Sequence, residues 1–121
     1  KVKILFYDEY KDRNGYTEED VLDCAYICGE EIYLGKYNDP RIELLCLFHE
    51  LGHVEADKQK LCENYILKTS QEAMAWELAV DLIKIYSYLF PDVKFDLKFN
   101  NDTIEYKFIQ KCLATYIKNE F

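Results

Sequence analysis

The order of hydrophobic and polar positions divides the chain into a strand-rich first part and a helical remainder. Residues 2–7 alternate loosely between apolar and polar side chains, which predicts a β-strand, and the polar residues 11–15 predict a turn. Residues 17–34 allow two interpretations. Thr17 followed by acidic residues is typical of a helix start, whereas two apolar runs on either side of Gly29 indicate a β-hairpin. We favour the hairpin, preceded by a short helical turn.

A long helix is predicted in the middle of the chain. Asp39 is placed to cap it, and Pro40 suits its first helical position. Residues 44–48 are apolar all round, so this helix should lie buried at the centre of its domain. We expect it to run to about Ala56, and the polar residues 57–64 to form a loop or a frayed end.

A second long helix is predicted to start at Thr69-Ser70, which would cap it, and to run to Leu89 before Pro91. The alternating apolar residues of segment 92–99 are compatible with an extended conformation.

A last helix is predicted to run to about Lys118, because Asp102-x-x-Glu105 resembles a capping box. Three helices and a small, about three-stranded sheet fit the length. The pattern therefore predicts one α+β domain over residues 1–121.

Composition and charge narrow the classes of function. The chain has 121 residues, half of them hydrophobic, which suits one domain with a core and excludes disorder. Lys and Arg number 15 and Asp and Glu 23, a net charge of −8 that disfavours binding to nucleic acid or to anionic membranes. No apolar run approaches the roughly 20 residues needed to span a bilayer. The five cysteines are odd in number and follow no secretory signal, so we expect a reducing, cytoplasmic location. We interpret Cys24 and Cys28, spaced C-x3-C, as buried thiols rather than a redox or metal pair.

The chemistry of the chain is concentrated in His49-Glu50-Leu51-Gly52-His53, an H-E-x-x-H motif within the predicted central helix. His49 and His53 lie one turn apart on one helix face and can bind one zinc ion from the same side. Glu50 can then take the proton of a water molecule as general base. The chain has only two histidines, and both are in this motif. The alternative interpretation is a pair of hydrogen-bonded core histidines.

A catalytic zinc needs a third protein ligand, and without a third histidine it must be a carboxylate or a thiolate. Cys62 in the following loop is one candidate, and the second helix offers Glu72, Glu77 and Asp81.

Helical periodicity favours Glu72 among these candidates. It begins an apolar stripe at i, i+3, i+4, i+7, i+10, i+11 and i+14 that also holds Ala75, Trp76, Ala79, Leu82, Ile83 and Tyr86. Glu77 and Asp81 lie on the opposite face, which we expect to be solvated. A lone carboxylate on a core-facing stripe needs a partner, and a metal ion is a good one.

These residues resemble a known family. Arg41-x6-Phe48 followed by H-E-L-G-H, and later Glu72-Ala73-Met74-Ala75-Trp76-Glu77-Leu78-Ala79, resemble the two motifs of the ImmA/IrrE family of zinc metallopeptidases. The resemblance covers about residues 25–90. It implies that Glu72 is the third zinc ligand. Trp76 stands where the family usually has Asn or Asp, which changes the surroundings of the site.

The resemblance implies a gluzincin-like fold, with a small twisted sheet packed on the motif helix and the ligand helix. It also implies a cytoplasmic peptidase of phage, mobile-element or bacterial origin that cleaves a protein such as a helix-turn-helix repressor. No helix-turn-helix pattern is found in this chain.

Two further expectations concern the reaction. Tyr26, Tyr33 and Tyr65 are candidate donors to the oxyanion. The exposed edge of the hairpin is expected to pair with an extended substrate, which would place Glu31 to Leu34 beside the cleft. Two other classes of function stay open: a zinc-containing interaction module without proteolysis, and an interaction domain without metal.

Overall fold

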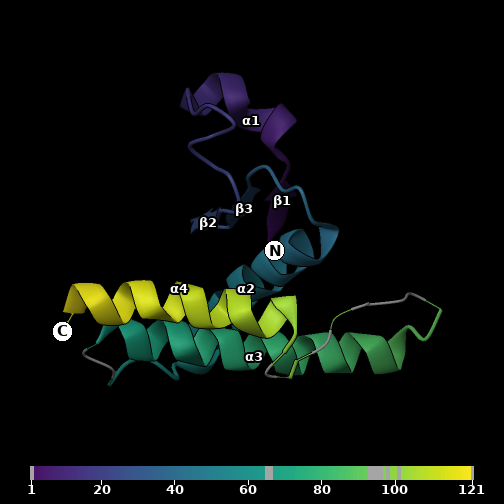
Figure 1. Ribbon diagram of the computed structural model, residues 1–121, viewed down its shortest axis with the longest axis vertical. Coiled ribbons are helices and arrows are strands. Elements are labelled where there is room, and N and C mark those ends of the chain that lie inside the picture. Colours follow the sequence, from purple (N-terminus) through teal and green to yellow (C-terminus); the bar gives the residue numbers. More distant parts are fainter. Residues whose placement is uncertain (1, 65–66, 93–96, 98, 101, 121) are drawn as a thin grey trace.

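The computed structural model describes residues 2–64, 67–92, 97, 99, 100 and 102–120. Within these residues the chain is an α+β protein, as predicted. In chain order its elements are β1 (Lys3–Leu5), α1 (Tyr7–Asn14), β2 (Ala25–Cys28), β3 (Glu31–Leu34), α2 (Pro40–Gln59), α3 (Lys68–Leu89) and α4 (Ile104–Glu120). Figure 1 shows α2 in the middle, with the sheet and α1 on one side of it and the pair α3 and α4 on the other.

The three described strands form one sheet in the order β1-β3-β2. β3 pairs with β1 in parallel and with β2 in antiparallel, and the register sets Tyr26 opposite Tyr33. Gly29 lies in the short turn between β2 and β3 with a φ of 62°, a left-handed conformation that glycine adopts without strain. The predicted hairpin is therefore confirmed, and β1 and β2 are the edges of the described sheet.

The prediction of a polar turn over residues 11–15 is wrong, because α1 occupies most of that segment. Tyr7 and Tyr10, three residues apart, are both buried on one side of this otherwise polar helix. The Tyr10 hydroxyl donates a hydrogen bond to the main-chain oxygen of Leu34 at 3.0 Å. Two buried tyrosines thus hold a polar segment on the sheet as a helix.

The start of α2 is confirmed. The Asp39 side chain accepts a hydrogen bond from the main-chain N–H of Arg41 at 2.9 Å, and Pro40 is the first helical residue. The helix continues past the predicted end and stops at Gln59, where Lys60 adopts a left-handed φ of 57°. Part of the predicted loop is therefore helical.

The core lies mainly between α2 and α3. A Cβ atom at Gly52 would come within 2.2 Å of the main-chain oxygen of Ala75, so only glycine permits this approach of the two backbones. The buried residues of this cluster are Ile42, Leu45, Cys46, Phe48, Trp76, Ala79 and Ile83. The apolar stripe predicted on α3 thus faces the core, except for its last member, the exposed Tyr86.

The predicted cap of α3 at Thr69-Ser70 is wrong. The helix begins at Lys68, and Leu67 takes the cap position without a side-chain hydrogen bond. The Glu120 carboxylate, at the far end of α4, instead accepts hydrogen bonds from the Thr69 main-chain N–H at 3.1 Å and from its hydroxyl at 2.8 Å. The first turn of α3 is therefore capped by a residue distant in sequence.

The predicted last helix is confirmed as α4, although Thr103 rather than Asp102 caps it. The Thr103 hydroxyl oxygen accepts a hydrogen bond from the main-chain N–H of Tyr106 at 3.4 Å. Glu105 is buried, and its Oε1 lies 4.0 Å from Nη1 of Arg41 on α2. This ion pair helps to hold the start of α4 on α2.

Three remaining predictions concern the rest of the chain. The extended segment predicted over residues 92–99 falls largely on residues 93–96 and 98, which lie outside the described part. Among the described helices, none combines the length and the apolar character needed to cross a bilayer. All five cysteines are free, but Cys24 and Cys28 are exposed, contrary to the expectation that they are buried.

Candidate metal centre

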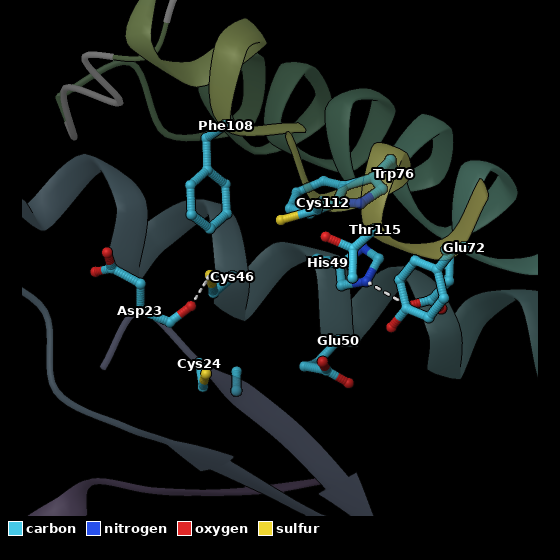
Figure 2. Close-up of a pocket in the computed structure, with 12 residues that line it drawn as sticks. Asp23, Cys24, Cys46, His49, Glu50, Glu72, Trp76, Phe108, Cys112 and Thr115 are labelled. Atoms are coloured by element: carbon cyan, nitrogen blue, oxygen red, sulfur yellow. Dashed lines mark hydrogen bonds and ion pairs between the residues drawn. The ribbon is translucent and has the colours of Figure 1, made fainter. Parts of the chain in front are cut away.

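Two histidines of α2 and one glutamate of α3 converge between the two helices. One ligand atom from each of His49, His53 and Glu72 lies within 4.8 Å of the others. The Nε2 atoms of His49 and His53 lie 3.4 Å and 2.5 Å from the two oxygens of the Glu72 carboxylate. His49 and Glu72 are buried, and 22% of the His53 side chain is exposed. Figure 2 shows His49 facing Glu72 from the neighbouring helix.

The local sequence explains this convergence. The spacing of four residues sets both imidazoles on one face of α2. Gly52, directly before His53, lets α3 come close to this part of α2. Glu72 lies in the first part of α3 on the core-facing stripe, so the close approach carries its carboxylate to the two imidazoles.

The charges at the site suit a metal. Burial favours the neutral acid of Glu72, but the imidazoles of His49 and His53 outweigh burial and hold its pKa well below the usual value. Burial lowers the pKa of His49, which favours the neutral imidazole. Burial also acts to lower the pKa of His53, but the Glu72 carboxylate outweighs it and raises that pKa. An ionised carboxylate and neutral imidazoles are the forms that ligate metals, so Glu72 and His49 are in the ligating form, and a metal at His53 would displace a proton from its imidazole.

One orphaned atom supports the same interpretation. Oε2 of Glu72 is buried and has no hydrogen-bond partner among the described residues, although Nε2 of His53 lies 2.5 Å away. The two groups are close but not aligned as donor and acceptor. Such an arrangement is typical of ligands that point at a common ion. The described residues therefore fit a metal ion held by two nitrogens and one oxygen.

Glu50 lies beside this group and borders the same cavity. Its side chain is buried, and burial raises the pKa of Glu50 to about 7. A carboxyl group with such a pKa can exchange protons near neutral pH.

The cavity next to the three candidate ligands has a volume of about 250 Å³. Its walls come from the segment that leads into β2 and from α2, α3 and α4. The lining residues are Asp23, Cys24, Ala25, Cys46, His49, Glu50, Glu72, Trp76, Phe108, Cys112, Thr115 and Tyr116. Figure 2 shows His49, Glu50 and Glu72 at one end of the cavity, and Asp23, Cys46 and Phe108 at the other.

Sequence reasoning missed the contribution of α4. Tyr116 on α4 lines the cavity together with Glu72, and burial and the nearby Glu72 carboxylate raise the pKa of Tyr116. The spacing of Phe108, Cys112 and Tyr116 at i, i+4 and i+8 places them on one face of a helix. That spacing is visible in the sequence, but it does not say which part of the fold the face covers.

The other candidate ligands lie elsewhere. Cys62 borders a separate pocket with Lys60 and Gln71, and it does not belong to the group of three. Glu77 and Asp81 are exposed on the opposite face of α3, as expected. Within the described part of the chain, no fourth His, Cys, Asp or Glu joins the group.

Two of the three tyrosines proposed as oxyanion donors, Tyr26 and Tyr33, do not line the cavity. Tyr26 and Tyr33 stack on each other in the sheet with ring centroids 4.7 Å apart, and Tyr65 lies outside the described residues.

The expected place of Glu31–Leu34 beside the cleft is wrong, because β3 is the central strand and none of its residues lines the cavity. β2 is the edge strand that borders the cavity, through Ala25.

Comparisons of the chain with protein-family models, with curated proteins and with solved structures found no match.

Proposed function

We propose that the protein is a zinc-dependent metallopeptidase. The observation that carries this proposal is the convergence of His49, His53 and Glu72, with Glu50 beside them at a cavity. Two imidazoles, one carboxylate and a free coordination position form a donor set typical of catalytic zinc. A purely structural site has no need of Glu50.

Each residue then has a defined task. A bound zinc ion would supply Lewis-acid polarisation of the scissile carbonyl and lower the pKa of the attacking water. Glu50 accepts the proton of that water and passes it to the nitrogen of the leaving amine. Tyr116, beside Glu72 at the cavity, keeps the Glu72 carboxylate oriented. The free edge of β2 is positioned to pair with an extended substrate.

The resemblance to the ImmA/IrrE family supports a protein substrate. His49, Glu50, His53 and Glu72 are the residues that match the motif positions of that family. His49, His53 and Glu72 form the candidate ligand group, and His49, Glu50 and Glu72 line the cavity. The proposed substrate class is therefore a cytoplasmic protein such as a helix-turn-helix repressor of a phage or mobile element. The free thiols of the chain suit a reducing compartment.

The test is cleavage of a mixture of proteome-derived peptides, read by mass spectrometry, with zinc-loaded wild type and Glu50→Gln. We expect Glu50→Gln to keep its zinc and to lose cleavage. Glu77→Gln, an exposed glutamate of α3, is the matched control and should cleave as wild type does. Cleavage by Glu50→Gln at the wild-type rate would refute the role of Glu50.

One observation favours a second function, a zinc-containing interaction module without proteolysis. His49, Glu50 and Glu72 are each less than 10% exposed, so α4 restricts access to them. The two functions differ in whether a ligand reaches the metal. Addition of acetohydroxamate to the Co²⁺-loaded protein should change its visible spectrum if the centre is open, and should leave it unchanged if the centre is closed.

A further inference from the structure

The indole of Trp76 stacks on the imidazole of His49. The ring centroids are 3.9 Å apart, and the planes meet at 22°. Both side chains are buried, with 4% of Trp76 and 8% of His49 exposed. Trp76 follows Glu72 by four residues on α3, so one face of this helix presents both the carboxylate and the stacking ring to His49 (Figure 2).

His49 lacks the contact that usually orients a metal-binding imidazole. Its Nε2 faces Glu72, while its Nδ1 is buried without a hydrogen-bond partner among the described residues. Histidine ligands ordinarily donate their second ring N–H to a carboxylate, a carbonyl or a water, and this bond fixes the ring. At His49 the ordering contacts are aromatic: the face of Trp76 and the ring of His53, 4.6 Å away between centroids.

Trp76 is itself firmly held. It belongs to the core cluster between α2 and α3, and the ring of Phe108 on α4 meets it edge-on at a centroid distance of 6.2 Å. Because the indole is held in one orientation by its neighbours, it can restrict the rotation of the imidazole stacked on it.

We propose that Trp76 is a positioning residue that sets the orientation of His49 for metal binding by ring stacking. The proposal deepens the proposed function and rests on it, because His49 must be a ligand. Trp76 is the one tryptophan of the chain, so its fluorescence should respond directly to a metal bound at His49.

The first experiment uses wild-type protein freed of metal. Co²⁺ bound at His49 should quench the Trp76 emission and reach saturation at one equivalent, because the indole stacks on a ligand ring. Zn²⁺, which does not quench, should displace Co²⁺ and restore the emission. Co²⁺ that binds at one equivalent without quenching would overturn the stacked arrangement. This measurement needs no variant, so it stands even if a core substitution unfolds the protein.

The second experiment measures the Zn²⁺ affinity of variants by competition with a chromogenic chelator, with folding checked by circular dichroism. Trp76→Leu should weaken Zn²⁺ binding about 10–100-fold, the range seen when contacts around a ligand are lost. Trp76→Phe keeps an aromatic face and should stay within about threefold of wild type. Ile83→Ala is the matched control, because Ile83 is buried in the same cluster two turns further along α3.

Ile83→Ala should lower thermal stability and leave the Zn²⁺ affinity unchanged. Wild-type affinity in Trp76→Leu, or an equal loss in Ile83→Ala, would overturn the positioning role while the metal centre stands. Wild-type protein that binds neither Zn²⁺ nor Co²⁺ would instead overturn the proposed function, and the role of Trp76 with it.

Discussion

Replacing Gly52 by alanine should force α2 and α3 apart at the metal centre. The added Cβ would lie 2.2 Å from the oxygen and 3.1 Å from the carbonyl carbon of Ala75, and 3.3 Å from the nitrogen of Ala79. Ordinary contact begins near 3.4 Å, so the helices would have to separate by roughly 1 Å. All three neighbours are main-chain atoms, so no side chain can turn aside to relieve the overlap.

Two effects of this substitution oppose each other. Alanine favours a helix over glycine by about 1 kcal/mol. Overpacking in a tight core costs typically about 1–3 kcal/mol and occasionally more. Because the overlap is with rigid backbone, we expect the upper part of that range and a net loss of about 1–2 kcal/mol. Metal ligands tolerate displacements of only about 0.2 Å, so Zn²⁺ affinity should also fall by about tenfold or more.

Urea denaturation measures the loss of unfolding free energy, and chelator competition measures the loss of Zn²⁺ affinity. Ala73→Gly, at an exposed position of α3, is the control that measures helix propensity alone. This substitution should lower the free energy of unfolding by about 1 kcal/mol and leave the Zn²⁺ affinity unchanged. A Gly52→Ala protein as stable as wild type, with wild-type Zn²⁺ affinity, would refute the close approach of the two helices.

Three further predictions concern other contacts. Burial favours the neutral acid of Glu120, but the hydrogen bonds from Thr69 outweigh burial and lower the pKa of Glu120. The ionised Glu120 therefore stabilises the folded protein above the unfolded pKa near 4.3, and this stabilisation is lost as the pH falls through the lowered pKa of the folded state. The stability difference between wild type and Glu120→Gln, measured by urea denaturation, should therefore be larger at pH 7 than near pH 3, and an equal difference at both would refute the cap. Tyr116→Phe removes the hydroxyl that interacts with the Glu72 carboxylate at the cavity and should weaken Zn²⁺ binding several-fold or more in chelator competition; unchanged affinity would refute a role for Tyr116 at the site. Tyr10→Phe leaves a buried main-chain oxygen of β3 without its donor and should cost about 1–3 kcal/mol in denaturation, with Zn²⁺ binding as in wild type.

The candidate site could be located from the sequence because its geometry is largely local. The spacing of His49 and His53 is fixed by the helix period, and the stripe on α3 distinguishes Glu72 from Glu77 by the face on which each lies. Small residues at the contact, such as Ala75, indicate that the two helices can approach. These arguments need only the helices themselves and the rule that apolar faces are buried.

The features that were missed depend on contacts between distant segments. α1 is polar, and the two tyrosines that hold it gain their energy only against the sheet. A hairpin pattern does not say which of its strands a third strand will join, so the central place of β3 was not foreseen. Glu120 caps α3 across the fold, and Tyr116 reaches Glu72 only because α4 packs on α3. Local pattern carries no information about these pairings.

Elemental analysis of the purified protein tests the central claim most directly. Wild type supplied with zinc should hold one zinc ion per chain. His49→Ala, His53→Ala and Glu72→Ala should each lose it, while Glu77→Gln, altered on the solvent face of α3, should keep it. Wild type that holds no metal after zinc is supplied, or Glu72→Ala that keeps its zinc, would contradict the proposed centre.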